Sequence, residues 1–197
     1  MMTEQEAIEI VSYKLGLKKG RAALEEKDLN PQAIEQAIED QQKDQARTIA
    51  ARDYLEATKV LKAMRQERYI AQQNDFLKQY QQRENVQALE SGLLMCVKHQ
   101  GQGPTADKAD QVEVHYRGTL IDGREFDSSE MRGKPSCFRV SKVIAGWREA
   151  LLLMPEGSQF EMIVPAPLAY GEKGSGSNVP PHATLIFEVE ILKVLKA

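Results

Sequence analysis

The residues of this chain that could do chemistry are aromatic, with one acidic partner. Phe126 is followed directly by Asp127, on a segment that Asp122-Gly123 is expected to turn back toward Tyr116. The sequence offers no convincing set of a nucleophile, a general base or metal ligands, because its three histidines lack matching ligands. The residues by themselves therefore do not indicate covalent or metal-dependent chemistry, and no cofactor and no metal are expected.

Residues 112–129 predict the hairpin that would position these side chains. Apolar positions alternate with polar ones, which is the period of a strand with one buried face: Val112, Val114, Tyr116, Gly118 and Leu120. Asp122-Gly123 favours a two-residue turn in which both central positions have positive φ. The return arm would then place Phe126 and Asp127 near Tyr116.

The composition divides the 197 residues near position 90. The first 90 residues contain 2 glycines and 1 proline, and the remainder contain 11 and 7. Helix-forming residues fill the first part and β-branched and turn residues the second, so a helical domain should precede a β-rich one. The 26 basic and 29 acidic residues give a net charge of −3, which argues against nucleic acid as a partner.

Two short helices are predicted at the start of the chain. Thr3 and Glu6 fit a capping box, and the helical spacing of apolar residues continues to about Leu24. Asn30 as N-cap and Pro31 at the first helical position announce a second helix.

A long helix should follow, since residues 44–83 contain neither glycine nor proline. Such a helix would reach about 60 Å, and its later half, polar after Met64, is expected to cross solvent. Two short amphipathic helices and the start of a third make a poor core, so a homodimer through these helices is expected. A monomeric three-helix cap is the alternative.

The N-terminus is acidic, and no run approaches 18 apolar residues. Taken as a complete chain that begins at Met1, the sequence predicts no secretory signal, no membrane partner and a cytoplasmic location. There Cys96 and Cys137 would remain free thiols with packing roles.

The second part predicts an α+β fold. Strands are expected at residues 93–99, 112–120, 138–140, 159–164 and 184–195. One short helix should lie within residues 143–153.

Five blocks in this part carry a resemblance to a known family: residues 114–118, 123–129, 143–147, 169–171 and 179–190. In this order they resemble an FKBP-type peptidyl-prolyl cis-trans isomerase over residues 91–197. The resemblance implies a twisted antiparallel half-barrel around one short helix, and an enzyme that accelerates X–Pro isomerisation.

The first part resembles the dimerisation module of bacterial Mip-like and FklB-like FKBPs, at residues 12–16, Gly20, 74–77 and 89–93. The resemblance implies intertwined helices of two chains. The expected domains are a dimerisation domain at 1–43, a connecting helix at 44–88 and a catalytic domain at 89–197.

The resemblance also implies the site. Six residues would be catalytic: Tyr116, Phe126, Asp127, Trp147, Tyr170 and Phe187. Six more would bind substrate: Val143, Ile144, Arg132, Phe138, Val179 and His182. Trp147 would form the floor beneath the prolyl ring, and Asp127 would pair with Arg132 near the reacting carbonyl.

The partners implied are proline-containing unfolded or partly folded proteins, a second copy of the chain and a macrolide inhibitor. Ser136-Cys137 and Asn178 depart from common family residues, which bears on macrolide affinity and on the residue preferred before proline. A binding module with incidental turnover, and a coiled-coil scaffold with an inert domain, are the alternatives to an isomerase that assists folding.

Overall fold

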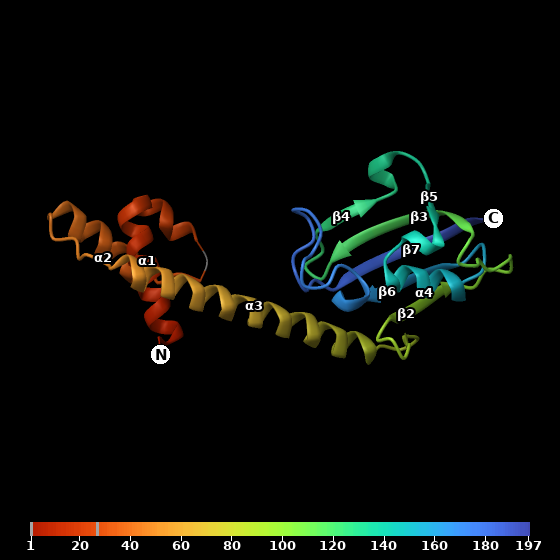
Figure 1. Ribbon diagram of the computed structural model, residues 1–197, viewed down its shortest axis with the longest axis horizontal. Coiled ribbons are helices and arrows are strands. Elements are labelled where there is room, and N and C mark those ends of the chain that lie inside the picture. The colour runs from red at the N-terminus through yellow and green to blue at the C-terminus, as the bar shows by residue number, and fades with distance from the viewer. Residues whose placement is uncertain (1, 27) are drawn as a thin grey trace. The chain divides into compact units, whose positions relative to one another are not determined.

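The computed structural model describes residues 2–26 and 28–197 (Figure 1). The chain forms two compact units, Met1–Tyr69 and Ile70–Ala197. The long helix α3, Ala51–Gln81, contributes its first part to one unit and its last turns to the other.

The two short helices begin where their caps predicted. Helix α1, Glu4–Lys19, carries the Thr3–Glu6 capping box. It ends earlier than expected, because Gly20 has a φ of 58° and the chain continues as a 3-10 helix, Gly20–Glu25. Helix α2, Pro31–Gln42, begins where the Asn30 side chain accepts hydrogen bonds from the N–H groups of Gln32 and Ala33.

Close packing of α1 against α2 explains Gly16. A Cβ atom there would lie 2.8 Å from the Ala37 Cβ and 2.9 Å from the Ile34 carbonyl oxygen. The buried Tyr13 hydroxyl donates to Asp40 Oδ2 at 2.7 Å and accepts from the Arg47 N–H at 2.9 Å. These contacts order the helical unit around a small core.

Helix α3 is shorter than predicted and partly buried. It begins at Ala51, and its 31 residues span about 46 Å. The expectation that its later half crosses solvent is wrong, because Phe76, Leu77 and Tyr80 pack on Leu94 and Ile163. The sequence did not reveal this contact, because Leu94 and Ile163 lie at outward-facing strand positions further along the chain.

The second unit is one antiparallel sheet in the order β1-β2-β6-β7-β3-β4, with β5 also paired to β3. Its strands are β1 Gln87–Ala88, β2 Leu94–His99, β3 Gln111–Leu120, β4 Glu125–Ser128, β5 Ser136–Arg139, β6 Gln159–Val164 and β7 Leu185–Leu195. The alternation predicted for β3 is confirmed, because all five expected positions are buried.

The β3–β4 hairpin forms, but its predicted two-residue turn is wrong. The Leu120 N–H donates to the Arg124 carbonyl, and the Gly123 N–H donates to the Leu120 carbonyl, both at 2.9 Å. Of Asp122 and Gly123, only the glycine has positive φ, at 84°. The loop therefore has three residues, an arrangement that needs a left-handed residue only at its last position.

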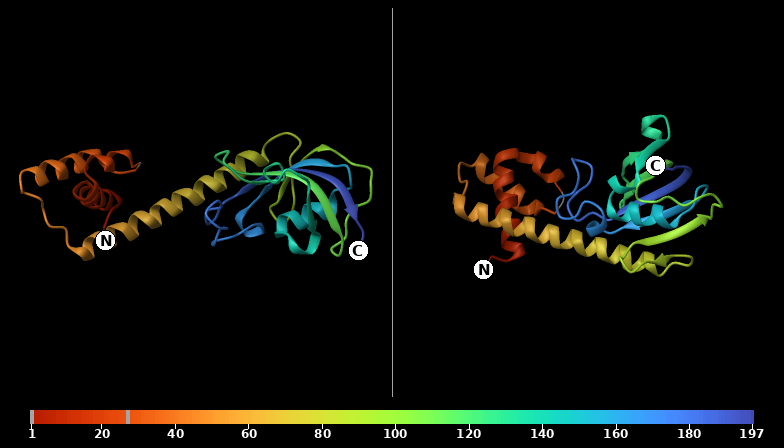
Figure 2. Two further views of the ribbon diagram at one scale, coloured as in Figure 1. Left: turned by 90° about the horizontal axis from the view of Figure 1, so that it is seen from above. Right: turned by 45° about the vertical axis from the view of Figure 1, so that its right-hand side comes forward.

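Helix α4, Ala145–Leu153, lies against the concave face of the sheet (Figures 1 and 2). Trp147, Ala150 and Leu151 of α4 enter the main core together with inward residues of β3, β6 and β7. Gly146 permits the close approach, since a Cβ there would lie 2.6 Å from Val164 Cγ1. The predicted α+β fold, a twisted antiparallel sheet around one short helix, is confirmed.

Asp110 secures the end of the chain after β7. It is 3% exposed and accepts hydrogen bonds from Lys196 Nζ at 2.8 Å, the Asp107 N–H at 2.7 Å and the Ala197 N–H at 3.0 Å. The bond from Lys196, followed by the bond from the Asp107 backbone, lowers the pKa of Asp110 from 3.8 to about 2.

This lowered pKa predicts the acid response of the fold. The folded carboxylate binds protons less readily than the unfolded one, so its stabilisation is present above pH 3.8 and is lost as the pH falls toward about 2. Asp110→Asn should lower the thermal unfolding midpoint near neutral pH and flatten its decline between about pH 4 and about pH 2. Asp107→Asn, at an exposed neighbour, is the control. Identical melting curves for wild type and Asp110→Asn would contradict this role.

Candidate active site

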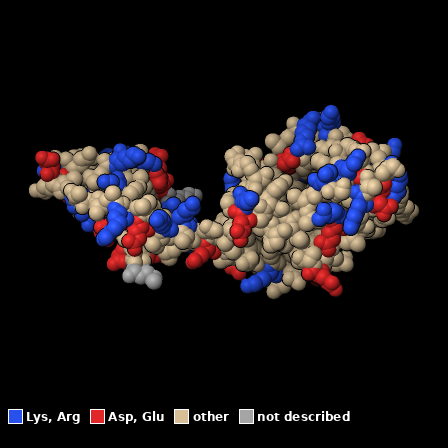
Figure 3. Space-filling view, viewed as in Figure 1, with Lys and Arg blue, Asp and Glu red and all other residues tan. Residues whose placement is uncertain are grey.

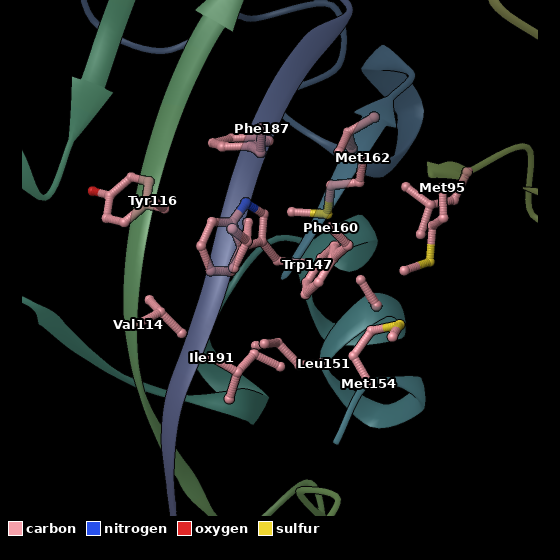
Figure 4. Close-up of a cluster of buried hydrophobic side chains, with 14 of the residues drawn as sticks. Met95, Val114, Tyr116, Trp147, Leu151, Met154, Phe160, Met162, Phe187 and Ile191 are labelled. Carbon is pink, nitrogen blue, oxygen red and sulfur yellow. The ribbon is translucent and has the colours of Figure 1, made fainter. Parts of the chain in front are cut away.

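Five aromatic rings are in contact inside the second unit. The centroid of the Trp147 ring, from α4, lies 5.4 Å from that of Tyr116 and 5.3 Å from that of Phe187, both in edge-to-face arrangements (Figure 4). The Phe138 ring also meets Trp147 edge to face, at a centroid distance of 5.7 Å. Phe126 adds a further contact, 5.5 Å from Phe187. We call these five residues the aromatic cluster. Trp147 is only 4% exposed, whereas Phe126 and Phe138 are half-buried at its edges.

One carboxylate is held beside the aromatic cluster. The Tyr116 hydroxyl, which points away from Trp147 in Figure 4, donates to Asp127 Oδ2 at 2.6 Å. Arg132 Nη2 donates to both oxygens of Asp127, at 2.8 and 2.9 Å. Burial, and then the bond to Asp127, raise the pKa of the Tyr116 hydroxyl, so it remains a donor.

The local course of the chain brings Arg132 to Asp127. Strands β4 and β5 pair with successive parts of β3, and the segment between them leaves the sheet. The Ser129 N–H donates to the Tyr116 carbonyl at 2.9 Å, which ends the pairing. A 3-10 helix, Glu130–Arg132, then stops at Gly133, which has a φ of 68°. This turn returns the guanidinium to the acid five residues earlier.

The remaining expected residues occupy two loops. Val143 and Ile144 precede α4 and pack against the main core. In the loop between β6 and β7, Val179 is buried in the same core, and Tyr170 is 40% exposed. Burial and the nearby charge of Asp127 raise the pKa of Tyr170. His182 lies in this loop at a φ of 62°, and its N–H donates to the Gly171 carbonyl at 2.9 Å.

Gly118 lies beneath two rings of the aromatic cluster, although the sequence analysis treated it as a strand position and as the end of block 114–118. A Cβ there would lie 2.8 Å from Phe126 Cζ and 2.9 Å from Phe187 Cε1. Two rings therefore rest on the bare backbone of β3. A glycine at a buried position of an alternating strand is the signal that could have revealed this approach.

Other features of the structure bear on metals, membranes and thiols. Among the described residues, no group of three His, Cys, Asp or Glu side chains could hold a metal ion. No helix within residues 2–26 and 28–197 has both the length and the apolar character needed to span a bilayer.

Cys96 and Cys137 are free thiols, but the packing role expected for Cys137 is wrong, because its position on β5 is exposed. On the face in Figure 3, acidic and basic side chains are interspersed.

The geometry places one paired carboxylate beside a group of packed aromatic rings. The rings exclude water from the Trp147 surface, and the acid already has a cationic and a hydroxyl partner. A group placed against such an apolar surface is favoured in its less polar form, because the surface cannot solvate the more polar form as water does.

Comparison with known proteins gives two family matches. Residues 8–97 match the domain amino terminal to FKBP-type peptidyl-prolyl isomerase, and residues 103–192 match the FKBP-type peptidyl-prolyl cis-trans isomerase domain. The FKBP-type 22 kDa peptidyl-prolyl cis-trans isomerase of Escherichia coli is 40% identical over 193 residues, which cover 93% of this chain and 94% of that protein.

Other similar proteins differ from this chain in length. The outer membrane protein MIP of Legionella longbeachae is 48% identical over 122 residues, 62% of this chain and 52% of that protein. The crystal structure of FkpA from Escherichia coli is 32% identical with a TM-score of 0.66, covering 93% of this chain and 81% of that one. A peptidyl-prolyl cis-trans isomerase structure from Pseudomonas syringae is 35% identical with a TM-score of 0.62, covering 66% and 96%.

These relatives correct the expected location. The prediction of a cytoplasmic protein is wrong, because the relatives include proteins outside the cytoplasm, such as the outer membrane protein MIP. The prediction rested on an acidic N-terminus and on the lack of a long apolar run. Neither feature determines the cellular compartment of the protein.

Gly118→Ala should displace the Phe126 and Phe187 rings. The added methyl group overpacks this position, which typically destabilises a fold by about 1–3 kcal/mol. Urea unfolding measures the loss, and near-ultraviolet circular dichroism reports the change in aromatic packing. Thr119→Ala, at the next residue of β3, is the control. A Gly118→Ala protein with wild-type stability and an unchanged aromatic spectrum would show that the rings do not depend on this contact.

Proposed function

Because this chain belongs to the family of FKBP-type peptidyl-prolyl cis-trans isomerases, we propose that its aromatic cluster is where X–Pro bonds are isomerised. The main support for this proposal is the buried indole of Trp147, which lies near the Asp127 carboxylate that Tyr116 and Arg132 hold in place. The substrates would be proline-containing unfolded or partly folded proteins.

The physical demand of the reaction suits an apolar surface. Rotation about the X–Pro bond must break amide resonance, at a cost of about 18–20 kcal/mol. In the twisted state the nitrogen loses conjugation and the carbonyl becomes less polar. An environment without water therefore stabilises the twisted state relative to the planar one, and no covalent intermediate is required.

Each site residue has a proposed role. Trp147 would support the prolyl ring, with Tyr116, Phe126 and Phe187 as walls. The Ile144 N–H and the Tyr170 hydroxyl would hold peptide carbonyls, which fixes the substrate while its bond turns. The neighbours Val143, Phe138, Val179 and His182 would bound the substrate on either side.

Asp127 would act as a fixed charge rather than as a base. Its oxygens accept hydrogen bonds from Tyr116 and Arg132, so both oxygens already have partners. From this position it would interact with the carbonyl carbon of the twisted bond. The raised pKa values of Tyr116 and Tyr170 support a site that keeps one protonation state near neutral pH.

Asp127→Asn tests this mechanism. Loss of the charge should lower kcat/KM for a proline tetrapeptide by about tenfold, which corresponds to about 1.4 kcal/mol of transition-state stabilisation. For the wild type, kcat/KM should stay constant from about pH 6 to about pH 9, since no proton is transferred. Asp122→Asn, in the exposed hairpin loop, is the matched control. A bell-shaped pH profile, or full activity of Asp127→Asn, would contradict the proposed role.

We also propose that the chain is a homodimer through its N-terminal helices. Support comes from the family match over residues 8–97 and from the small core of the helical unit, formed by Ala7, Val11, Ala57 and Leu61. Leu55 of α3 is 55% exposed in the single chain, which is unfavourable for a leucine near a helix start.

In functional terms, residues 1–43 would dimerise, 44–88 would connect and 89–197 would catalyse. Two linked sites would give the dimer chaperone-like binding of unfolded clients. A macrolide inhibitor would occupy the same apolar surface, where Ser136 is buried and receives a 3.4 Å hydrogen bond from Arg132 Nη1.

Leu55→Glu tests the dimer and its purpose together. Light scattering should give twice the single-chain mass for the wild type and the single-chain mass for the variant. Turnover of a tetrapeptide should be unchanged, because each site is complete in one chain. Proline-limited refolding of a protein client should be accelerated at least about tenfold less, because the linked second site is lost.

Leu153→Glu, at an exposed leucine of α4, controls for the added charge. A monomeric wild type would contradict the dimer. Equal client refolding by the wild type and a monomeric Leu55→Glu protein would contradict the chaperone-like role.

A further inference from the structure

Gln73 is a buried polar residue in the part of α3 that packs on the sheet. It is 3% exposed, while its neighbours Gln72 and Asn74 are exposed. Its Oε1 accepts a hydrogen bond of 2.9 Å from the N–H of Thr184, which is itself 1% exposed. The polar composition of this stretch had predicted that Gln73 faces solvent, so the contact is visible only in the folded chain.

The other end of the Gln73 amide lacks a partner. Its Nε2 is buried, and within the described residues it forms no hydrogen bond. An unpaired buried donor is unfavourable, and a methionine of similar length would fill the same space without that loss. The bond from the Thr184 N–H to Gln73 Oε1 is therefore the polar contact that a methionine could not make.

Thr184 lies at the end of the loop between β6 and β7, which carries three proposed site residues, Tyr170, Val179 and His182. The loop closes on itself twice, through the His182 N–H to the Gly171 carbonyl at 2.9 Å and through paired bonds between Ser175 and Val179 at 2.9 and 3.1 Å. These bonds give the loop internal shape, the buried side chain of Val179 packs it against the main core, and Gln73 holds its end at Thr184. Thr184 lies two residues after His182 and three before Phe187 of the aromatic cluster.

We propose that Gln73 is a positioning residue for the isomerase. By holding Thr184, its side chain keeps the loop of Tyr170, Val179 and His182 in place beside the aromatic cluster. Gln73 lies outside residues 103–192, the part that matches the isomerase domain, so the connecting helix contributes to the geometry of the site. This inference rests on the proposed function, because it assumes that the loop binds substrate.

The test uses the full chain and the variant Gln73→Met, which removes the acceptor but fills the space. The Thr184 and His182 amides should exchange with solvent faster, and KM for a proline tetrapeptide should rise by about threefold to tenfold, the effect of losing one hydrogen bond. We expect kcat to change less, because the rings around Trp147 are untouched.

Two control variants separate positioning from stability. Gln72→Met makes the same change at an exposed site of the same helix and should alter neither measurement. Leu77→Ala removes packing from the same face of α3, so it should lower the urea midpoint while leaving KM and the Thr184 amide unchanged.

The proposal is overturned if Gln73→Met keeps the wild-type KM, or if KM rises equally in Leu77→Ala. The exchange rate of the Thr184 amide reports the hydrogen bond directly and does not depend on activity. Full activity of Asp127→Asn would instead count against the proposed site, so the two failures are distinguishable.

Discussion

The packing of aromatic rings around the Trp147 indole is the interaction on which the second unit depends. The rings come from α4, β3, β5 and β7, so no single element can form the surface. Each buried aromatic side chain removes about 150–250 Å² from water, and the edge-to-face contacts add to that stabilisation. The surface forms only if the sheet curves around α4 and α4 lies close to the sheet. Gly118 allows the Phe126 and Phe187 rings to approach β3, and Gly146 allows α4 to approach Val164.

The site combines low polarity with one charge without leaving that charge unpaired. Tyr116 makes this combination possible, because its ring packs on Trp147 while its hydroxyl binds Asp127. Arg132 supplies the opposite charge from outside the sheet and remains exposed. In the proposed mechanism, a carboxylate so arranged would influence a bound carbonyl, which suits a reaction whose barrier is rotation rather than bond cleavage.

The sheet is covered on both faces, and each cover has a different consequence. Helix α4 fills the concave face and presents Trp147. The last turns of α3 cover the outer face at Leu94 and Ile163, and they bring Gln73 to the exit of the β6–β7 loop. A helix that the sequence presents as a connector is thus also part of the catalytic unit.

Sequence patterns were sufficient where the determinant is local or repeated. The alternation of β3, the caps at Thr3 and Asn30 and the order of five short blocks predicted the fold class and the family. Most of the proposed site residues lie within those blocks. The sequence patterns did not predict the cellular location correctly, because the composition of the N-terminus does not determine the compartment in which a protein works.

The tertiary structure decided what depends on contacts between distant segments. It closed the hairpin with three residues, placed two rings over Gly118 and buried Gln73 under Thr184. The physical reason is that periodicity reports which side chains are apolar, whereas burial depends on which surface each of them meets. A glutamine among polar neighbours is expected to face solvent until the fold brings a backbone N–H from a distant segment to it.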